Sequence, residues 1–135
     1  MNGALDRDHE LARVLAHEAG QLLLGVRSTT PVAELKAAGD AASHVHLVAR
    51  LAAERPDDRV LSEEAAAHER TAAAGSGRVW IIDPLDGTTN FLHGFPQFAV
   101  SIALLHKGRL EQGVVYDPLR QELFTATRGA GALLN

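Results

Sequence analysis

The sequence predicts an α+β protein in which two N-terminal helices pack on an antiparallel sheet. Apolar residues recur at helical spacing in the first half of the chain, and strand-like apolar patterns follow residue 77. Hydrophobic residues make up 46% of the 135 positions, which is enough for one core. We therefore expect residues 1–135 to form a single α+β domain.

Two segments of the first half have the periodicity of amphipathic helices. Residues 4–26 carry apolar side chains every three or four positions and contain no proline, and Gly25 is a plausible stop. Residues 40–54 repeat the pattern and end before Pro56. Each helix should turn one apolar face toward the rest of the domain.

Strands are expected in the second half of the chain. They are residues 59–61, 78–82, 98–106, 110–116 and 122–127. The last three are separated by turn sequences at residues 107–108 and 117–120, so they predict an antiparallel meander. The alanine-rich residues 65–74, which precede Gly-Ser-Gly, indicate a surface loop.

Composition restricts the partners of this protein. The net charge is -4 and the basic residues are scattered, so the chain lacks the footprint of a nucleic-acid-binding surface. The absence of cysteine excludes disulfides and thiolate metal sites. The longest early apolar run, residues 22–24, is too short for a signal peptide or a membrane span. We expect a cytoplasmic protein with no nucleic-acid or membrane partner.

The strongest chemical signal is Asp-Pro-Leu-Asp-Gly-Thr at residues 83–88. A buried strand that ends before Asp83 delivers this carboxylate to a sheet edge, and Asp86 follows in a tight turn. Carboxylate oxygens are the ligands that Mg²⁺ and Mn²⁺ prefer in proteins. The motif therefore predicts a site for a divalent cation.

The residues after Asp86 predict a phosphate-binding turn at a helix start. The backbone amides of Gly87 and Thr88 lie at the positive end of the expected helix, where an anion is stabilised. The alternative is an ordinary solvated turn in which Thr88 or Thr89 caps the helix. The position of the string between a strand and a helix favours the phosphate site.

Residues 83–91 resemble the D-P-[IL]-D-G-T-x-N-F signature of the inositol monophosphatase family. The wider superfamily includes 3'(2'),5'-bisphosphate nucleotidases and fructose-1,6-bisphosphatases. Glu63 stands about twenty residues before Asp83, as the metal-binding glutamate of the family does, and Asp40 matches an acidic residue near the start of the second helix. Residues 95–135 also read like family sequence, so the resemblance covers nearly the whole chain.

The resemblance implies a role for each matched residue. Metal binding falls to Glu63, Asp83, the Leu85 carbonyl and Asp86, water activation to Asp40 and Thr88, and phosphate binding to the Gly87 and Thr88 amides. It further implies Mg²⁺ as cofactor, a small phosphomonoester such as inositol monophosphate as substrate, and a homodimer for the full-length family member. In such a reaction the metal neutralises the phosphate and acidifies water.

Two alternatives to an inositol monophosphatase stay open. Residues 35–64 are more similar to bisphosphate nucleotidases, whereas residues 89–91 and the following meander are more similar to inositol monophosphatases. Family members are also about twice this length, and their second half supplies another metal-ligating aspartate and much of the pocket. We therefore expect the N-terminal half of the layered α/β sugar-phosphatase fold without its C-terminal half, and an inactive metal-binding fragment is the second alternative.

Individual residues have structural alternatives as well. Asp40 could simply cap the second helix, and Glu63 could be a solvated strand end, although its spacing to the motif favours a ligand. We expect Lys36 to be solvated rather than to reach a phosphate. His44 and His46 stand two apart on a helix and face different directions, so they predict no metal site.

Overall fold

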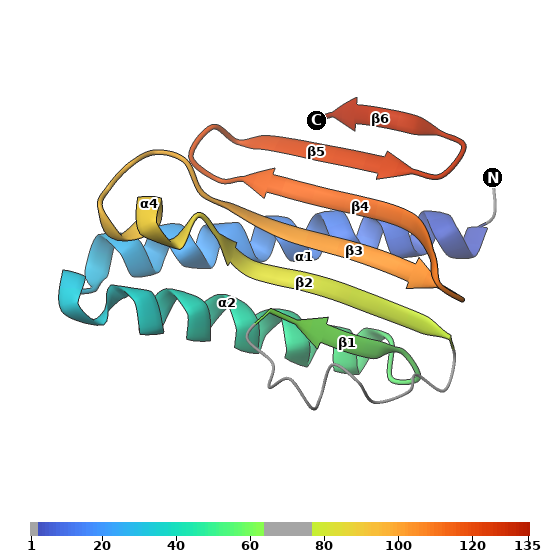
Figure 1. Ribbon diagram of the computed structural model, residues 1–135, viewed down its shortest axis with the longest axis horizontal. Helices are drawn as coiled ribbons and strands as arrows, with labels where there is room; N and C mark the ends of the chain where they lie inside the picture. The colour runs from blue at the N-terminus through green and yellow to red at the C-terminus, as the bar shows by residue number, and fades with distance from the viewer. Residues whose placement is uncertain (1–2, 64–76) are drawn as a thin grey trace.

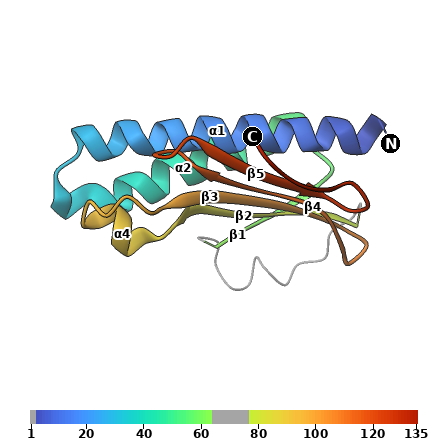
Figure 2. The same ribbon diagram turned by 90° about the horizontal axis from the view of Figure 1, so that it is seen from above.

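The computed structural model describes residues 3–63 and 77–135, which form a six-stranded sheet with two long helices on one face (Figures 1 and 2). The helices are α1 (Gly3–Thr29), α2 (Val32–Glu54) and α4 (Thr88–Leu92), and the strands are β1 (Arg59–Ser62), β2 (Arg78–Asp86), β3 (Ala99–His106), β4 (Arg109–Asp117), β5 (Glu122–Thr127) and β6 (Gly131–Leu134). Strand order in the sheet follows chain order. The α+β class is confirmed.

The sheet differs from the expected antiparallel one in a single pair. β2 to β6 pair antiparallel, but β1 pairs parallel to β2, with Ser62 opposite Ile82. Parallel pairing needs a connection of roughly a dozen residues or more, and residues 63–77 separate these strands. Because the two strands run in the same direction, their carboxyl ends meet at one edge of the sheet.

Helix α1 runs past the expected stop. Gly25 lies inside the helix, and the hydroxyls of Ser28 and Thr29 both donate hydrogen bonds to its carbonyl oxygen, at 3.0 and 2.8 Å. Near the middle of α1, a Cβ on Gly20 would lie 2.5 Å from the ring of Tyr116 on β4. The absence of a side chain at Gly20 therefore allows α1 to pack closely on the sheet.

Helix α2 begins eight positions earlier than expected, at Val32 directly after Pro31. Asp40 thus lies in the helix interior, and its interpretation as an N-cap is wrong. The neighbouring Gly39 is buried, and a Cβ there would lie 2.9 Å from the ring of Phe91. A glycine that looks like a helix breaker in the sequence is a point of contact between α2 and α4.

The core lies between the two long helices and the sheet. Its largest fully buried side chains include Trp80 and Phe91, and Trp80 donates its indole hydrogen bond to Asp58 at 2.9 Å. Neither long helix covers the opposite face of the sheet (Figure 2). Ile81, Val115 and Phe124, which alternate with buried strand residues, are exposed. Strand β6, which follows a turn at residues 128–130, was not among the predicted strands. No helix among the described residues is long and apolar enough to span a membrane.

Candidate active site

Glu63 and Asp83 meet where the parallel pairing of β1 with β2 ends, directly after Ser62 and Ile82. The amide of Glu63 donates a hydrogen bond to the carbonyl oxygen of Ile82 at 3.1 Å, which holds the end of β1 beside β2. The two acidic residues line a depression of about 330 Å³ together with Ser101 of β3. The parallel pairing therefore brings together two of the predicted metal ligands.

The Glu63 carboxyl is close enough to shift the pKa of Asp83. Burial and the neighbouring Glu63 carboxyl, with which Asp83 shares a hydrogen bond, raise the pKa of Asp83 to about 7. Two carboxylates that crowd each other form a site that a divalent cation stabilises, because its charge removes their repulsion. This crowding fits the predicted metal.

A bulge in β2 turns Asp86 to the same side as Asp83. Opposite β3, Asp83 pairs with Ser101 and Asp86 with Ala99, so three steps on β2 match two on β3. In a regular strand residues three apart face opposite sides, and one extra residue restores the same side. β2 thus continues to Asp86 instead of ending at residue 82 as expected.

Two hydrogen bonds fix the bulge. The Leu85 amide donates to Asp83 Oδ1 at 3.2 Å. On the helix side, the buried hydroxyl of Ser43 on α2 donates to the Pro84 carbonyl oxygen at 2.7 Å. The bulge is therefore held both by its own side chain and by the helix beneath it.

Gly87 connects the bulge to α4. Its φ of 85° is left-handed, and a Cβ there would lie 2.8 Å from the Gln97 carbonyl oxygen, so glycine is required on both counts. No side chain caps α4; Thr88 instead donates its hydroxyl to the Leu85 carbonyl oxygen at 3.3 Å. A carbonyl oxygen has two lone pairs, so that of Leu85 keeps the capacity to bind a cation.

Asp40 lies on α2 one residue after the contact with Phe91. Its Oδ2 accepts a hydrogen bond from Lys36 Nζ at 3.2 Å. The Lys36 side chain is exposed to solvent, as expected, and forms this ion pair at the surface. Asp40 Oδ1 is buried and has no hydrogen-bond partner in the described part of the chain. A buried carboxylate oxygen without a donor fits a role in binding a water molecule.

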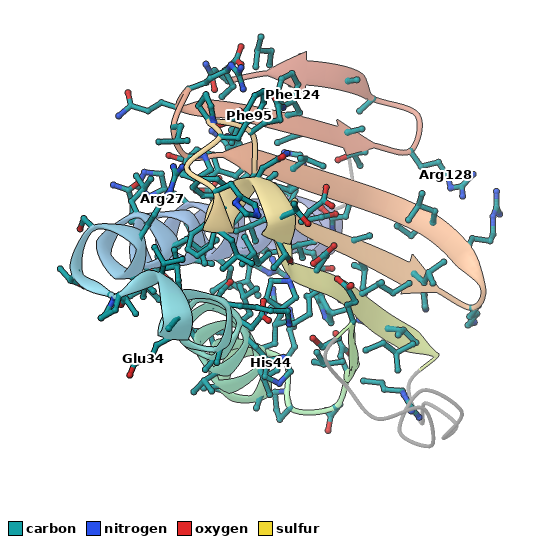
Figure 3. The ribbon with its side chains drawn as sticks, turned by 60° about the vertical axis from the view of Figure 1, so that its left-hand side comes forward. Arg27, Glu34, His44, Phe95, Phe124 and Arg128 are labelled. Carbon is teal, nitrogen blue, oxygen red and sulfur yellow. The ribbon has the colours of Figure 1, made fainter. Side chains whose placement is uncertain are left out.

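Sequence reasoning missed Ser43 as a functional residue. It lies three positions after Asp40, on the same face of α2, and this spacing was the available signal. His44, one residue on, is hydrogen-bonded to Ser62 at the end of β1, at 2.9 Å (Figure 3). His46 instead contacts Glu18 on α1 at 2.9 Å, so the two histidines do face different directions.

The described residues do not form a complete metal centre. Within residues 3–63 and 77–135, no three Asp, Glu or His side chains converge closely enough to hold a metal ion. Glu63 and Asp83 are together, whereas Asp86 has an exposed side chain. Glu64 and the loop predicted at residues 65–74 lie outside the described residues.

Comparison with known proteins identifies the family. Residues 5–135 match the model of the inositol monophosphatase family. The chain belongs to this family. The matched range contains every predicted site residue, so the resemblance read from residues 83–91 is confirmed as one of family.

Relatives of this inositol monophosphatase family chain are similar in sequence and in fold. The Nus factor SuhB of Pseudomonas aeruginosa is 53% identical over 96 residues, which cover 71% of this chain and 35% of that protein. The inositol monophosphatase of Anabaena sp. PCC 7120 superposes with a TM-score of 0.81 at 34% identity, over 99% of this chain and 47% of that one. SaIMPase-II with inositol monophosphate bound superposes with a TM-score of 0.74 at 31% identity, over 91% and 44%.

These comparisons also show how much of a relative the chain represents. It spans between a third and a half of the length of the curated relatives that it matches. The comparisons therefore show the fold and the family of this chain. They do not show that it has the activity of a whole family member.

Proposed function

We propose that the site catalyses Mg²⁺-dependent hydrolysis of a small phosphomonoester, most simply an inositol monophosphate. The observation that carries the proposal is the meeting of Glu63 and Asp83 at the parallel strand ends, directly before the bulge that carries Asp86. Family membership supports phosphatase chemistry. A cytoplasmic location and a homodimer of the full-length protein are parts of the same proposal.

Each residue has a task in this proposal. Glu63, Asp83, Asp86 and the Leu85 carbonyl hold Mg²⁺, which when bound supplies charge neutralisation and acidifies water. Asp40 accepts a proton from the attacking water, for which its unpartnered Oδ1 is suited. Thr88 orients the water, and the amides of Gly87 and Thr88 hold the phosphate oxygens.

Phosphate release tests the proposal. The chain would be assayed on a panel of inositol, sugar and nucleotide phosphates with Mg²⁺ and with EDTA, beside the variant Asp83→Asn. We expect release that requires Mg²⁺ and that Asp83→Asn reduces by two orders of magnitude or more, as expected for a group that stabilises transition-state charge (~10²-fold). Equal activity of the variant and the wild type would rule out the role of Asp83.

A 3'(2'),5'-bisphosphate nucleotidase is the second candidate. SaIMPase-II has also been solved with 2'AMP bound, and that structure superposes on this chain with a TM-score of 0.81. A nucleotide phosphate is therefore compatible with a similar framework. A larger kcat/KM for a 3'(2'),5'-bisphosphate nucleotide than for inositol monophosphate would favour this candidate.

The third candidate is a metal-binding fragment without turnover. It follows from the share of the relatives' length that the chain covers and from the incomplete convergence of acidic residues within residues 3–63 and 77–135. Calorimetric titration with Mg²⁺ distinguishes it. Mg²⁺ binding without phosphate release supports the inactive fragment. The absence of both Mg²⁺ binding and phosphate release contradicts the proposed metal site.

A further inference from the structure

Residues 93–97, which follow α4, pack against the Asp86–Gly87 turn, and we call them the wall. The Gln97 carbonyl oxygen packs so closely on Gly87 that a Cβ there would come within 2.8 Å of it. The same oxygen accepts a hydrogen bond from the Asn90 side-chain amide at 2.9 Å. The backbone carbonyl oxygen of Asn90 accepts one from the Phe95 amide, also at 2.9 Å. Movement of this wall would therefore move Gly87 and α4.

The side chains of the wall are not buried. Residues 93–97 are all exposed, and Phe95 is 60% exposed. Segments with few buried apolar contacts open easily unless hydrogen bonds from elsewhere restrain them. The position of the Gln97 carbonyl consequently depends on polar contacts.

Arg120, in the turn between β4 and β5, supplies such contacts. Its Nη1 donates to the Pro96 carbonyl oxygen at 3.2 Å and to Gln97 Oε1 at 3.0 Å. These bonds join the wall to a part of the chain more than twenty residues away. The positive charge of the guanidinium strengthens this contact relative to a neutral donor. Nη1 carries two hydrogens and also donates to Asp117, so its three acceptors share them.

Asp117 at the end of β4 fixes the guanidinium. Its Oδ2 accepts from Arg120 Nη1 at 2.9 Å, and its Oδ1 accepts the amides of Leu119 and Arg120, both at 3.1 Å. The Asp117 side chain is only 9% exposed. Asp117 also lines, with Asp86, Gly87 and Gln97, a cavity of about 310 Å³. The guanidinium is thus held in place before it engages the wall.

We propose that Arg120 is a positioning residue of the active site, which acts through the Pro96 and Gln97 wall on the Asp86–Gly87–Thr88 segment. Arg120 contacts no predicted ligand or phosphate-binding residue in the bonds described above. It holds the backbone against which Gly87 packs. The inference rests on the proposed function of that segment, and its experiment separates the two.

The test compares Arg120→Ala and Arg120→Lys with a matched control, Arg128→Ala. Arg128 is as exposed as Arg120, at 44% against 46%, and also donates to a backbone carbonyl, that of Leu110. It lies at the other end of β5, far from Phe95 (Figure 3). Each protein is measured by urea unfolding, by amide hydrogen exchange of residues 87–98, and by NMR titration with inorganic phosphate in the presence of Mg²⁺.

We expect Arg120→Ala to raise exchange selectively in residues 87–98, because both hydrogen bonds to the wall are lost. We expect phosphate binding to weaken roughly tenfold, an indirect effect through the displaced Gly87 and Thr88 amides that corresponds to about 1.4 kcal/mol. Arg120→Lys should restore part of the affinity, and Arg128→Ala should change neither quantity, although both alanine variants lose similar global stability. Phosphate affinity equal in the two alanine variants overturns the inference. If the wild-type chain binds no phosphate, the proposed function is contradicted, and hydrogen exchange alone tests the role of Arg120. A selective rise in the exchange of residues 87–98 in Arg120→Ala then supports the positioning role, and the absence of this rise overturns it.

Discussion

At the scale of single residues, Asp83 is where stability and chemistry oppose each other. Burial and the Glu63 carboxyl raise its pKa to about 7 from an ordinary value of 3.8. Between these two pH values the folded state binds more protons than the unfolded chain, so the free energy of unfolding falls as pH rises. At pH 8 without a cation, the ionised pair therefore weakens the fold.

We predict that Asp83→Asn raises the thermal midpoint of the chain at pH 8 in EDTA. The amide keeps the acceptor for Leu85 and can donate to Glu63, whereas the repulsion disappears. The same variant should lose the Mg²⁺-induced rise in midpoint that the wild type is expected to show. Glu63→Gln should reproduce both effects, and a lower midpoint of either variant in EDTA would contradict this account of the pair.

Gly87 is fixed by backbone strain and by packing, and the two causes can be separated. Gly87→Ala places a Cβ in the left-handed region, which costs about 1–3 kcal/mol, and also 2.8 Å from the Gln97 carbonyl oxygen. Gly108→Ala has the same backbone strain, with φ of 79°, but no atom within 4 Å of the new Cβ. Urea unfolding should show the larger loss for Gly87→Ala, and equal losses would exclude the contact with Gln97.

Residue chemistry was readable from the sequence wherever it is local. The motif at residues 83–88 predicted its own turn, because the glycine after Asp86 indicates a tight backbone turn directly, and Gly87 is indeed left-handed. Its role in metal binding stays a prediction. The contacts of Ser43 and Arg120 could not be predicted in this way, since each donates a hydrogen bond to backbone that lies far away in the chain. For Ser43 the spacing from Asp40 marks the helix face but not its partner. A serine inside a helix and an arginine in a turn are both ordinary surface residues by pattern.

At the scale of elements, the direction of β1 decides the site. An apolar period predicts a strand but carries no information about its partner or direction, so the parallel pairing of β1 and β2 was not predicted. Had β1 run antiparallel, Glu63 would have left the sheet at the opposite edge from Asp83. The late start assigned to α2 has a similar cause, because Gly39 weakens the helical pattern locally while its packing against Phe91 stabilises the fold.

Helix α2 is tied to the bulge of β2 through Ser43, and this tie can be measured. Ser43→Ala leaves the Pro84 carbonyl oxygen buried without its donor, which should cost about 1–3 kcal/mol. Ser28→Ala is the control, because its exposed hydroxyl also donates to a backbone carbonyl, that of Gly25. Urea unfolding should show a change of at most about 0.5 kcal/mol for the control. A similar small change for Ser43→Ala would show that the tie contributes little.

At the scale of the whole molecule, an ionic network joins the elements at the end opposite the site. Asp8 on α1 accepts from Arg55, which follows α2, at 2.9 Å and from Arg78 on β2 at 2.8 Å. Arg78 also donates to Asp58, which accepts the indole of Trp80. The buried Asp8 carboxylate thus connects the beginning of α1 to both the end of α2 and the start of β2.

Asp8→Asn should therefore be the most destabilising single-atom exchange among the ionic residues named above. The Asp8 side chain is 4% exposed, and removal of one partner from a buried ion pair costs about 3–5 kcal/mol because the remaining charges lose their compensation. Glu10→Gln is the matched control, since Glu10 lies on the same helix and pairs with Arg13 at 3.9 Å in solvent, where such pairs contribute at most about 1 kcal/mol. Urea unfolding measures the loss of stability in both variants.

Because the network is remote from Asp83, Asp8→Asn should leave the Mg²⁺ affinity of the folded chain unchanged. A weakened affinity would show that the network also holds the strand ends in place.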